Sequence, residues 1–122
     1  MKRLVYLISP NKISKKFYSD LDKVLSHGNI KFFQIKKKKT KIKNFIEISN
    51  KIKKITYKYN VKFIINDDFI LTLKTKADGC HMGQLDGSIK IAKKKLKNKI
   101  LGITCHNSKI LARNAIKNKA TY

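Results

Sequence analysis

Hydrophobic and polar positions follow two alternating patterns along the chain. Short continuous apolar runs, such as Leu4–Ile8, are typical of strands buried on both faces of a parallel sheet. Between them lie segments with apolar residues at three- and four-residue steps, such as Phe45, Ile48 and Ile52, which indicate amphipathic helices. The patterns predict strands at 4–8, 30–35, 61–65, 77–81 and 100–104, and helices at 14–26, 43–59, 69–75, 88–96 and 108–118.

This strict alternation of strand and helix predicts the α/β class, with a parallel sheet and right-handed crossovers. A doubly wound sheet and a barrel both fit the alternation. No G-x-G-x-x-G fingerprint follows the first strand, which disfavours the dinucleotide-binding type of doubly wound fold. Residues 120–122 look like the beginning of a sixth strand. We therefore expect residues 1–122 to form one partial barrel domain of about five βα units.

Composition narrows the class of protein. The 122 residues are 42% hydrophobic and 30% charged, which suits a globular domain, and no apolar run approaches the ~20 residues that span a membrane. The apolar stretch Leu4–Ile8 after the basic start is too short for a secretory signal peptide, so we expect a cytoplasmic location. The two cysteines do not form a C-x-x-C motif, so we do not expect a disulfide framework. The net charge of +23 comes almost entirely from lysines spread over every helix, which favours solvated surfaces over a specific nucleic-acid interface.

Acidic side chains follow two of the predicted strands. Asn66, Asp67 and Asp68 come directly after the third strand, and Asp86 follows the fourth within Gly83–Asp86. One of the first three could simply cap the next helix, and a helix cap and a metal ligand are equally good interpretations of Asp67 on this pattern alone. As a pair, Asp67 and Asp86 are the kind of carboxylates that hold Mg²⁺ together with substrate phosphates.

Cationic and hydroxyl side chains follow two other strands. Strand alternation places Gln34 and Lys36 on one face and lets Lys38 join them, although the lysine run around them could also be solvated surface. Two ammonium groups there would hold a diphosphate. Thr104 closes the fifth strand. The Cys-His pairs at 80–81 and 105–106 suggest zinc, but adjacent strand residues point to opposite faces, so zinc is disfavoured.

Taken together, these segments resemble the thiamine-phosphate synthase and thiazole tautomerase superfamily. The resemblance runs in colinear order through Leu4–Pro10, Gln34-x-Lys36-x-Lys38, Phe63–Asp67, Ala77–Asp86 and Leu101–His106. The family has an arginine where this chain has Lys36, and usually Gly-x-Ser-x-His where it has Gly102-x-Thr104-x-His106. The resemblance implies an incomplete TIM (β/α)8 barrel.

It also implies a transferase that couples a hydroxymethylpyrimidine diphosphate to a thiazole phosphate and releases pyrophosphate, with Mg²⁺ as cofactor. The small-molecule substrates would be its partners, with no specific nucleic acid and no membrane. No catalytic residue is assigned. The implied roles are Mg²⁺ binding for Asp67 and Asp86, pyrimidine diphosphate binding for Gln34, Lys36, Lys38 and Asn66, and pyrophosphate contact for Thr104.

Two alternatives stay open at this point. One is the tautomerase branch of the same superfamily, which tends to lack the second acid, so Asp86 speaks against it. The other is a noncatalytic basic module that binds polyanions. A TIM barrel needs eight strands, so we expect residues 1–122 to be the N-terminal part of such a barrel. We expect this part to be inactive on its own and to self-associate through its open sheet edges.

Overall fold

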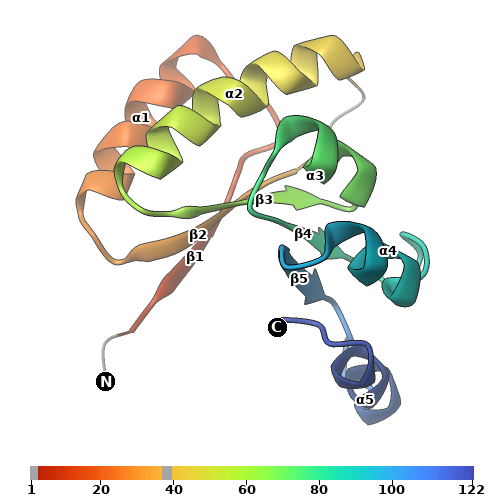
Figure 1. The fold of residues 1–122 in the computed structure, drawn as a ribbon. Coiled ribbons are helices and arrows are strands. Elements are labelled where there is room, and N and C mark those ends of the chain that lie inside the picture. Colours follow the sequence, from red (N-terminus) through yellow and green to blue (C-terminus); the bar gives the residue numbers. More distant parts are fainter. Residues whose placement is uncertain (1–2, 37–39) are drawn as a thin grey trace.

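The computed structural model describes residues 3–36 and 40–122. Within this part of the chain, five strands alternate with five helices (Figure 1). In chain order the elements are β1 (Val5–Ile8), α1 (Lys15–Ser26), β2 (Ile30–Ile35), α2 (Ile42–Lys58), β3 (Lys62–Asn66), α3 (Phe69–Thr75), β4 (Gly79–Met82), α4 (Ile89–Leu96), β5 (Ile100–Ile103) and α5 (Lys109–Lys117).

The strands form a single parallel sheet in the order β1-β2-β3-β4-β5. Each strand therefore lies beside its neighbours in sequence, as in a barrel, whereas a doubly wound sheet reverses its order at a switch point. The register places Ile8 beside Gln34 and Gln34 beside Ile64, so side chains of alternate residues on neighbouring strands share a face. This confirms the predicted α/β class with sequentially adjacent parallel strands.

The helices cover one face of the sheet, and the hydrophobic core lies between them. On the β1–β3 side the core includes Phe33 and Phe63 from the sheet with Leu25 and Ile52 from α1 and α2. On the β4–β5 side a second group of apolar residues packs under α4 and α5; it consists of Cys80, Met82, Ala92, Leu96, Leu101, Ile103 and Ala115. Both groups lie on the same continuous sheet, so the helices leave its other face for the cavity described below.

The sheet is curved, which a contact across its inner face demonstrates. In a flat sheet the segment after α5 would be about 24 Å from β1, because neighbouring strands are about 4.8 Å apart. Instead, the hydroxyls of Tyr6 on β1 and Tyr122 after α5 lie 2.5 Å apart. Two tyrosine side chains reach across this gap only if the sheet rolls inward.

The end of the described chain continues the sheet beyond β5. The Thr121 amide donates to the Leu101 carbonyl at 2.7 Å, and the Ile103 amide donates to the Tyr122 carbonyl at 2.9 Å. These bonds confirm the predicted beginning of a sixth strand beside β5, although the segment is too short to be assigned as one. The other boundaries agree with prediction to within one or two residues, and β2 and α3 match in full.

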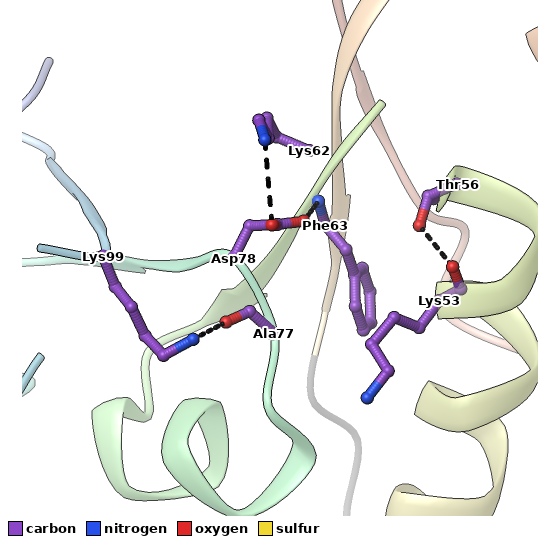
Figure 2. Close-up of polar contacts among 7 residues, drawn as sticks. All are labelled: Lys53, Thr56, Lys62, Phe63, Ala77, Asp78 and Lys99. Carbon is purple, nitrogen blue, oxygen red and sulfur yellow. Dashed lines mark hydrogen bonds and ion pairs between the residues drawn. The ribbon is translucent and has the colours of Figure 1, made fainter. Parts of the chain in front are cut away.

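Side chains also tie together the opposite, N-terminal edge of the sheet (Figure 2). The Asp78 carboxylate accepts a 2.8 Å hydrogen bond from the Phe63 amide and so joins the segment before β4 to β3. Lys99 donates to the Ala77 carbonyl at 2.6 Å, and Lys53 donates to the carbonyl of the last residue of α3 at 2.8 Å. These lysines have a structural role. None of the helices in the described ranges is long and apolar enough to cross a membrane.

Candidate functional site

A cavity of about 560 Å³ with polar and aromatic side chains in its wall opens on the inner face at the carboxyl ends of the strands. All five strands, or the loops that directly follow them, contribute to its wall, as does the segment after α5. Its lining consists of Tyr6, Ile8, Gln34, Asn66, Asp67, His81, Gly83, Thr104 and Tyr122. Four of the seven residues singled out from the sequence are therefore on one cavity wall.

The loop after β3 separates the roles of its two aspartates. Asp68 is the N-cap of α3, and its carboxylate accepts a 2.8 Å hydrogen bond from the Leu71 amide. Asp67 has a left-handed backbone with φ of 66°, and its amide donates to the His81 carbonyl at 2.7 Å. Because Asp68 caps the helix, the Asp67 carboxylate is left on the cavity wall, and the helix-cap interpretation of Asp67 is wrong.

Asp86 lies beside Asp67, although the two residues are 19 positions apart in the sequence. Its carboxylate accepts a 2.6 Å hydrogen bond from the Gly83 amide, which folds the loop after β4 back toward the cavity. Partial burial raises the pKa of Asp67, and the negative charge of Asp86 raises it further, while the charge of Lys36 lowers it. The two neighbouring carboxylates form a donor pair whose mutual repulsion a divalent cation would relieve.

The donor set fits a hard cation that also binds a ligand. Within residues 3–36 and 40–122, no group of three or more His, Cys, Asp or Glu side chains could enclose a metal. Two carboxylates leave most coordination positions to water and substrate oxygens, which is the usual environment of Mg²⁺. The residues present therefore suit Mg²⁺ that is bound together with a phosphorylated ligand.

The predicted diphosphate-binding residues occupy different depths of the wall. Gln34 is 4% exposed, and its side-chain amide donates to the Tyr6 hydroxyl at 2.9 Å. The Lys36 amide donates to the Ser9 hydroxyl at 3.0 Å, which fixes the backbone where β2 ends, and its side chain is exposed. Asn66 ends β3 on the cavity wall. Lys38 lies outside the described residues.

Thr104 follows β5 and contacts His81 across the inner face. Its hydroxyl lies 2.8 Å from Nε2 of His81, and its carbonyl accepts a 2.8 Å hydrogen bond from the Gln84 side chain. Burial lowers the pKa of His81, while Asp86 opposes that shift, so the neutral imidazole is favoured. Thr104 is thus held at both its side chain and its backbone.

Five lining residues were not predicted as binding residues, and three of them have polar side chains: Tyr6, His81 and Tyr122. Strand alternation could have found two of them, because Tyr6 precedes the cavity-facing Ile8 by two positions and His81 is adjacent to the fully buried Cys80. The opposite orientations of Cys80 and His81 agree with the argument that an adjacent pair cannot ligate one metal. Tyr122 carries no such signal, because its strand has barely begun.

The curved sheet of sequentially adjacent parallel strands, with a cavity at their carboxyl ends, defines the class of (β/α)-barrel folds, of which this chain forms part. The particular family follows from comparison with known sequences. A profile described as thiamine monophosphate synthase matches residues 5–122, and the chain belongs to this family.

Known relatives agree with this assignment. A thiamine-phosphate synthase of Pelagibacter ubique is 55% identical over 122 residues, covering 99% of this chain and 59% of the relative. One of Methanobrevibacter smithii is 34% identical, covering 97% of this chain and 56% of the relative. The solved structure of a thiamine phosphate pyrophosphorylase from Pyrococcus furiosus superimposes with a TM-score of 0.85 at 26% identity, covering 99% of this chain and 58% of that protein. The chain thus spans a little over half the length of these relatives.

Proposed function

We propose that this chain forms the pyrimidine diphosphate half of a thiamine-phosphate synthase site. The reaction would join a hydroxymethylpyrimidine diphosphate to a thiazole phosphate and release pyrophosphate. The observation that carries the proposal is the meeting of Asp67 and Asp86 beside Lys36, with Asp67 on the wall of the cavity that Gln34 and Thr104 also line. The presence of both acids favours the synthase over the tautomerase branch.

The described side chains suit the handling of a leaving diphosphate. Loss of pyrophosphate leaves cationic character on the pyrimidine methylene, and the thiazole nitrogen then forms the new bond. Lys36 supplies positive charge at the rim, and the Thr104 hydroxyl can donate to a phosphate oxygen. Mg²⁺, when bound by Asp67 and Asp86, would supply the charge that neutralises the leaving group.

The cavity also suits the organic part of this substrate. Aromatic rings of Tyr6, Phe32 and Tyr122 lie next to one another on the inner face, with ring centroids 5.4 to 5.9 Å apart. Such a wall can pack against a flat heterocycle, while the polar rim faces the diphosphate. The small-molecule substrates are the partners we propose, and the cytoplasmic location stays a prediction.

Calorimetric titration with the pyrimidine diphosphate, with and without Mg²⁺, tests the proposal. We expect binding that depends on Mg²⁺ and that Asp67→Ala weakens by at least about ten-fold, since even indirect partners of a metal site contribute that much. Asp20→Ala is the matched control, because Asp20 is an exposed acid on α1. Equal affinity of parent and Asp67→Ala would remove Asp67 from the site. Formation of thiamine phosphate from both substrates tests the transfer step itself.

A further inference from the structure

Five side chains form a continuous hydrogen-bonded chain across the inner face of the sheet. The Gln34 amide donates to the Tyr6 hydroxyl at 2.9 Å, and that hydroxyl lies 2.5 Å from the hydroxyl of Tyr122. Tyr122 in turn lies 3.3 Å from Nδ1 of His81, whose Nε2 lies 2.8 Å from the Thr104 hydroxyl. The chain thus connects β2, β1, the segment after α5, β4 and the end of β5.

The backbone makes room for Tyr122 at the centre of this chain. A Cβ atom on Gly102 would lie 2.5 Å from both Cε2 and the hydroxyl of Tyr122, and it would also overlap Cζ. Only glycine allows the ring to lie this close to β5. The ring also stacks on His81 with centroids 5.6 Å apart, so Tyr122 is held by position as well as by its hydroxyl.

The donors and acceptors fit together best in one direction. Because the Gln34 amide donates to Tyr6, the Tyr6 hydrogen is available for Tyr122, and the Tyr122 hydrogen for Nδ1 of His81. A neutral imidazole that accepts at Nδ1 carries its hydrogen on Nε2 and donates to the Thr104 oxygen. The Thr104 hydrogen then points into the cavity. In the reverse direction, the Tyr6 hydroxyl would accept twice and its own hydrogen would have no acceptor within this chain.

We propose that Tyr122 is a positioning residue that fixes the tautomer of His81 and thereby presents the Thr104 hydroxyl to the cavity as a hydrogen-bond donor. The inference deepens the proposed function, because the group that such a donor fits is an anionic oxygen of the pyrophosphate. Tyr122 itself need not touch the ligand. Its hydroxyl acts through His81 on Thr104.

The imidazole ¹⁵N shifts of His81 test the tautomer directly in the whole chain at pH 8. We expect a protonated Nε2 and an unprotonated Nδ1 in the parent. In Tyr122→Phe the ring remains but the donor is lost, so the shifts should move toward a mixture of tautomers. Tyr6→Phe removes only the preceding link and should leave the His81 tautomer unchanged. Tyr57→Phe, at an 87% exposed position, is the matched control.

Titration with inorganic pyrophosphate and Mg²⁺ tests the consequence for binding. Tyr122→Phe should bind about five-fold more weakly, the effect of one hydrogen bond, while Tyr57→Phe binds as the parent does. A parent with its proton on Nδ1, or a folded Tyr122→Phe with an unchanged His81 tautomer, would overturn the inference. If Tyr122→Phe does not fold, the His81 tautomers of the parent and of Tyr6→Phe test the inference instead. Both proteins should carry the proton on Nε2. A parent that binds no pyrophosphate refutes the proposed function, whereas the tautomer result is independent of it.

Discussion

Substitution of Gly102 by alanine should destabilise the protein through Tyr122 alone. The added methyl group would lie 2.5 Å from the Tyr122 hydroxyl and Cε2, well inside van der Waals contact, so the ring must move. Overpacking of this kind costs about 1–3 kcal/mol. Displacement of the ring also breaks its hydrogen bonds to Tyr6 and His81, each of which contributes about 1 kcal/mol. We therefore expect the free energy of unfolding to fall by about 3–5 kcal/mol.

A double-mutant cycle measured by urea denaturation separates this cause from a general intolerance of β5. In a Tyr122→Ala background the space next to Gly102 is free, and alanine has a lower conformational entropy cost than glycine in a strand. Gly102→Ala should then be neutral or slightly stabilising, which gives a coupling energy of about 3–5 kcal/mol between the two positions. An equal loss of stability in both backgrounds would refute the reasoning, because the cost could not then come from the tyrosine ring.

Two further predictions concern the loop after β3 and the buried thiol. Asp68→Ala should lower the free energy of unfolding by about 1 kcal/mol, because the hydrogen bond from the Leu71 amide to the helix cap is lost. Unlike Asp67→Ala, this variant should keep Mg²⁺-dependent ligand binding. Loss of that binding would show that Asp68 belongs to the site. Burial raises the pKa of the Cys80 thiol to about 11, whereas the unfolded thiol ionises near 9, so Cys80 should contribute stability that is complete below pH 9 and is lost as the pH rises toward 11. Unfolding measured at pH 8 and pH 10.5 should therefore show a smaller pH dependence in Cys80→Ala, and equal pH dependence in variant and parent would exclude this thiol as the cause. In the native protein, an alkylating reagent should modify the half-buried Cys105 well before Cys80.

The strands and helices could be predicted because each of them has its own pattern of hydrophobic residues in the sequence. The apolar run at Phe63–Ile65 is buried on both faces, and the 3- and 4-residue steps of Phe45 and Ile52 place both residues in the core. The polar positions at strand ends could also be predicted, since parallel strands end at one edge. Asp67 and Asp86 therefore lie together, as the sequence indicated.

The series of hydrogen-bonded side chains across the inner face of the sheet could not be predicted in this way. It depends on the curvature of the sheet, which brings Tyr6 to Tyr122 across 116 positions of sequence. It depends also on the absence of a side chain at Gly102, whose significance is evident only when the neighbouring ring is placed. The identity of the residue that caps α3 likewise needed the observed backbone, because by sequence alone either Asp67 or Asp68 could have been the cap.

The lysines that tie the N-terminal edge of the sheet determine how ionic strength acts on the two ends of the barrel. Lys53 and Lys99 donate to backbone carbonyls, which carry no net charge, so their bonds are not ion pairs that salt would screen. The formal charge of +23 makes the compact chain repel itself, and this repulsion is screened beyond about 8 Å in physiological salt. Added salt therefore strengthens the scaffold while it weakens the attraction of anionic ligands to the opposite rim. Stability and the affinity for anionic ligands should therefore respond to added salt in opposite directions.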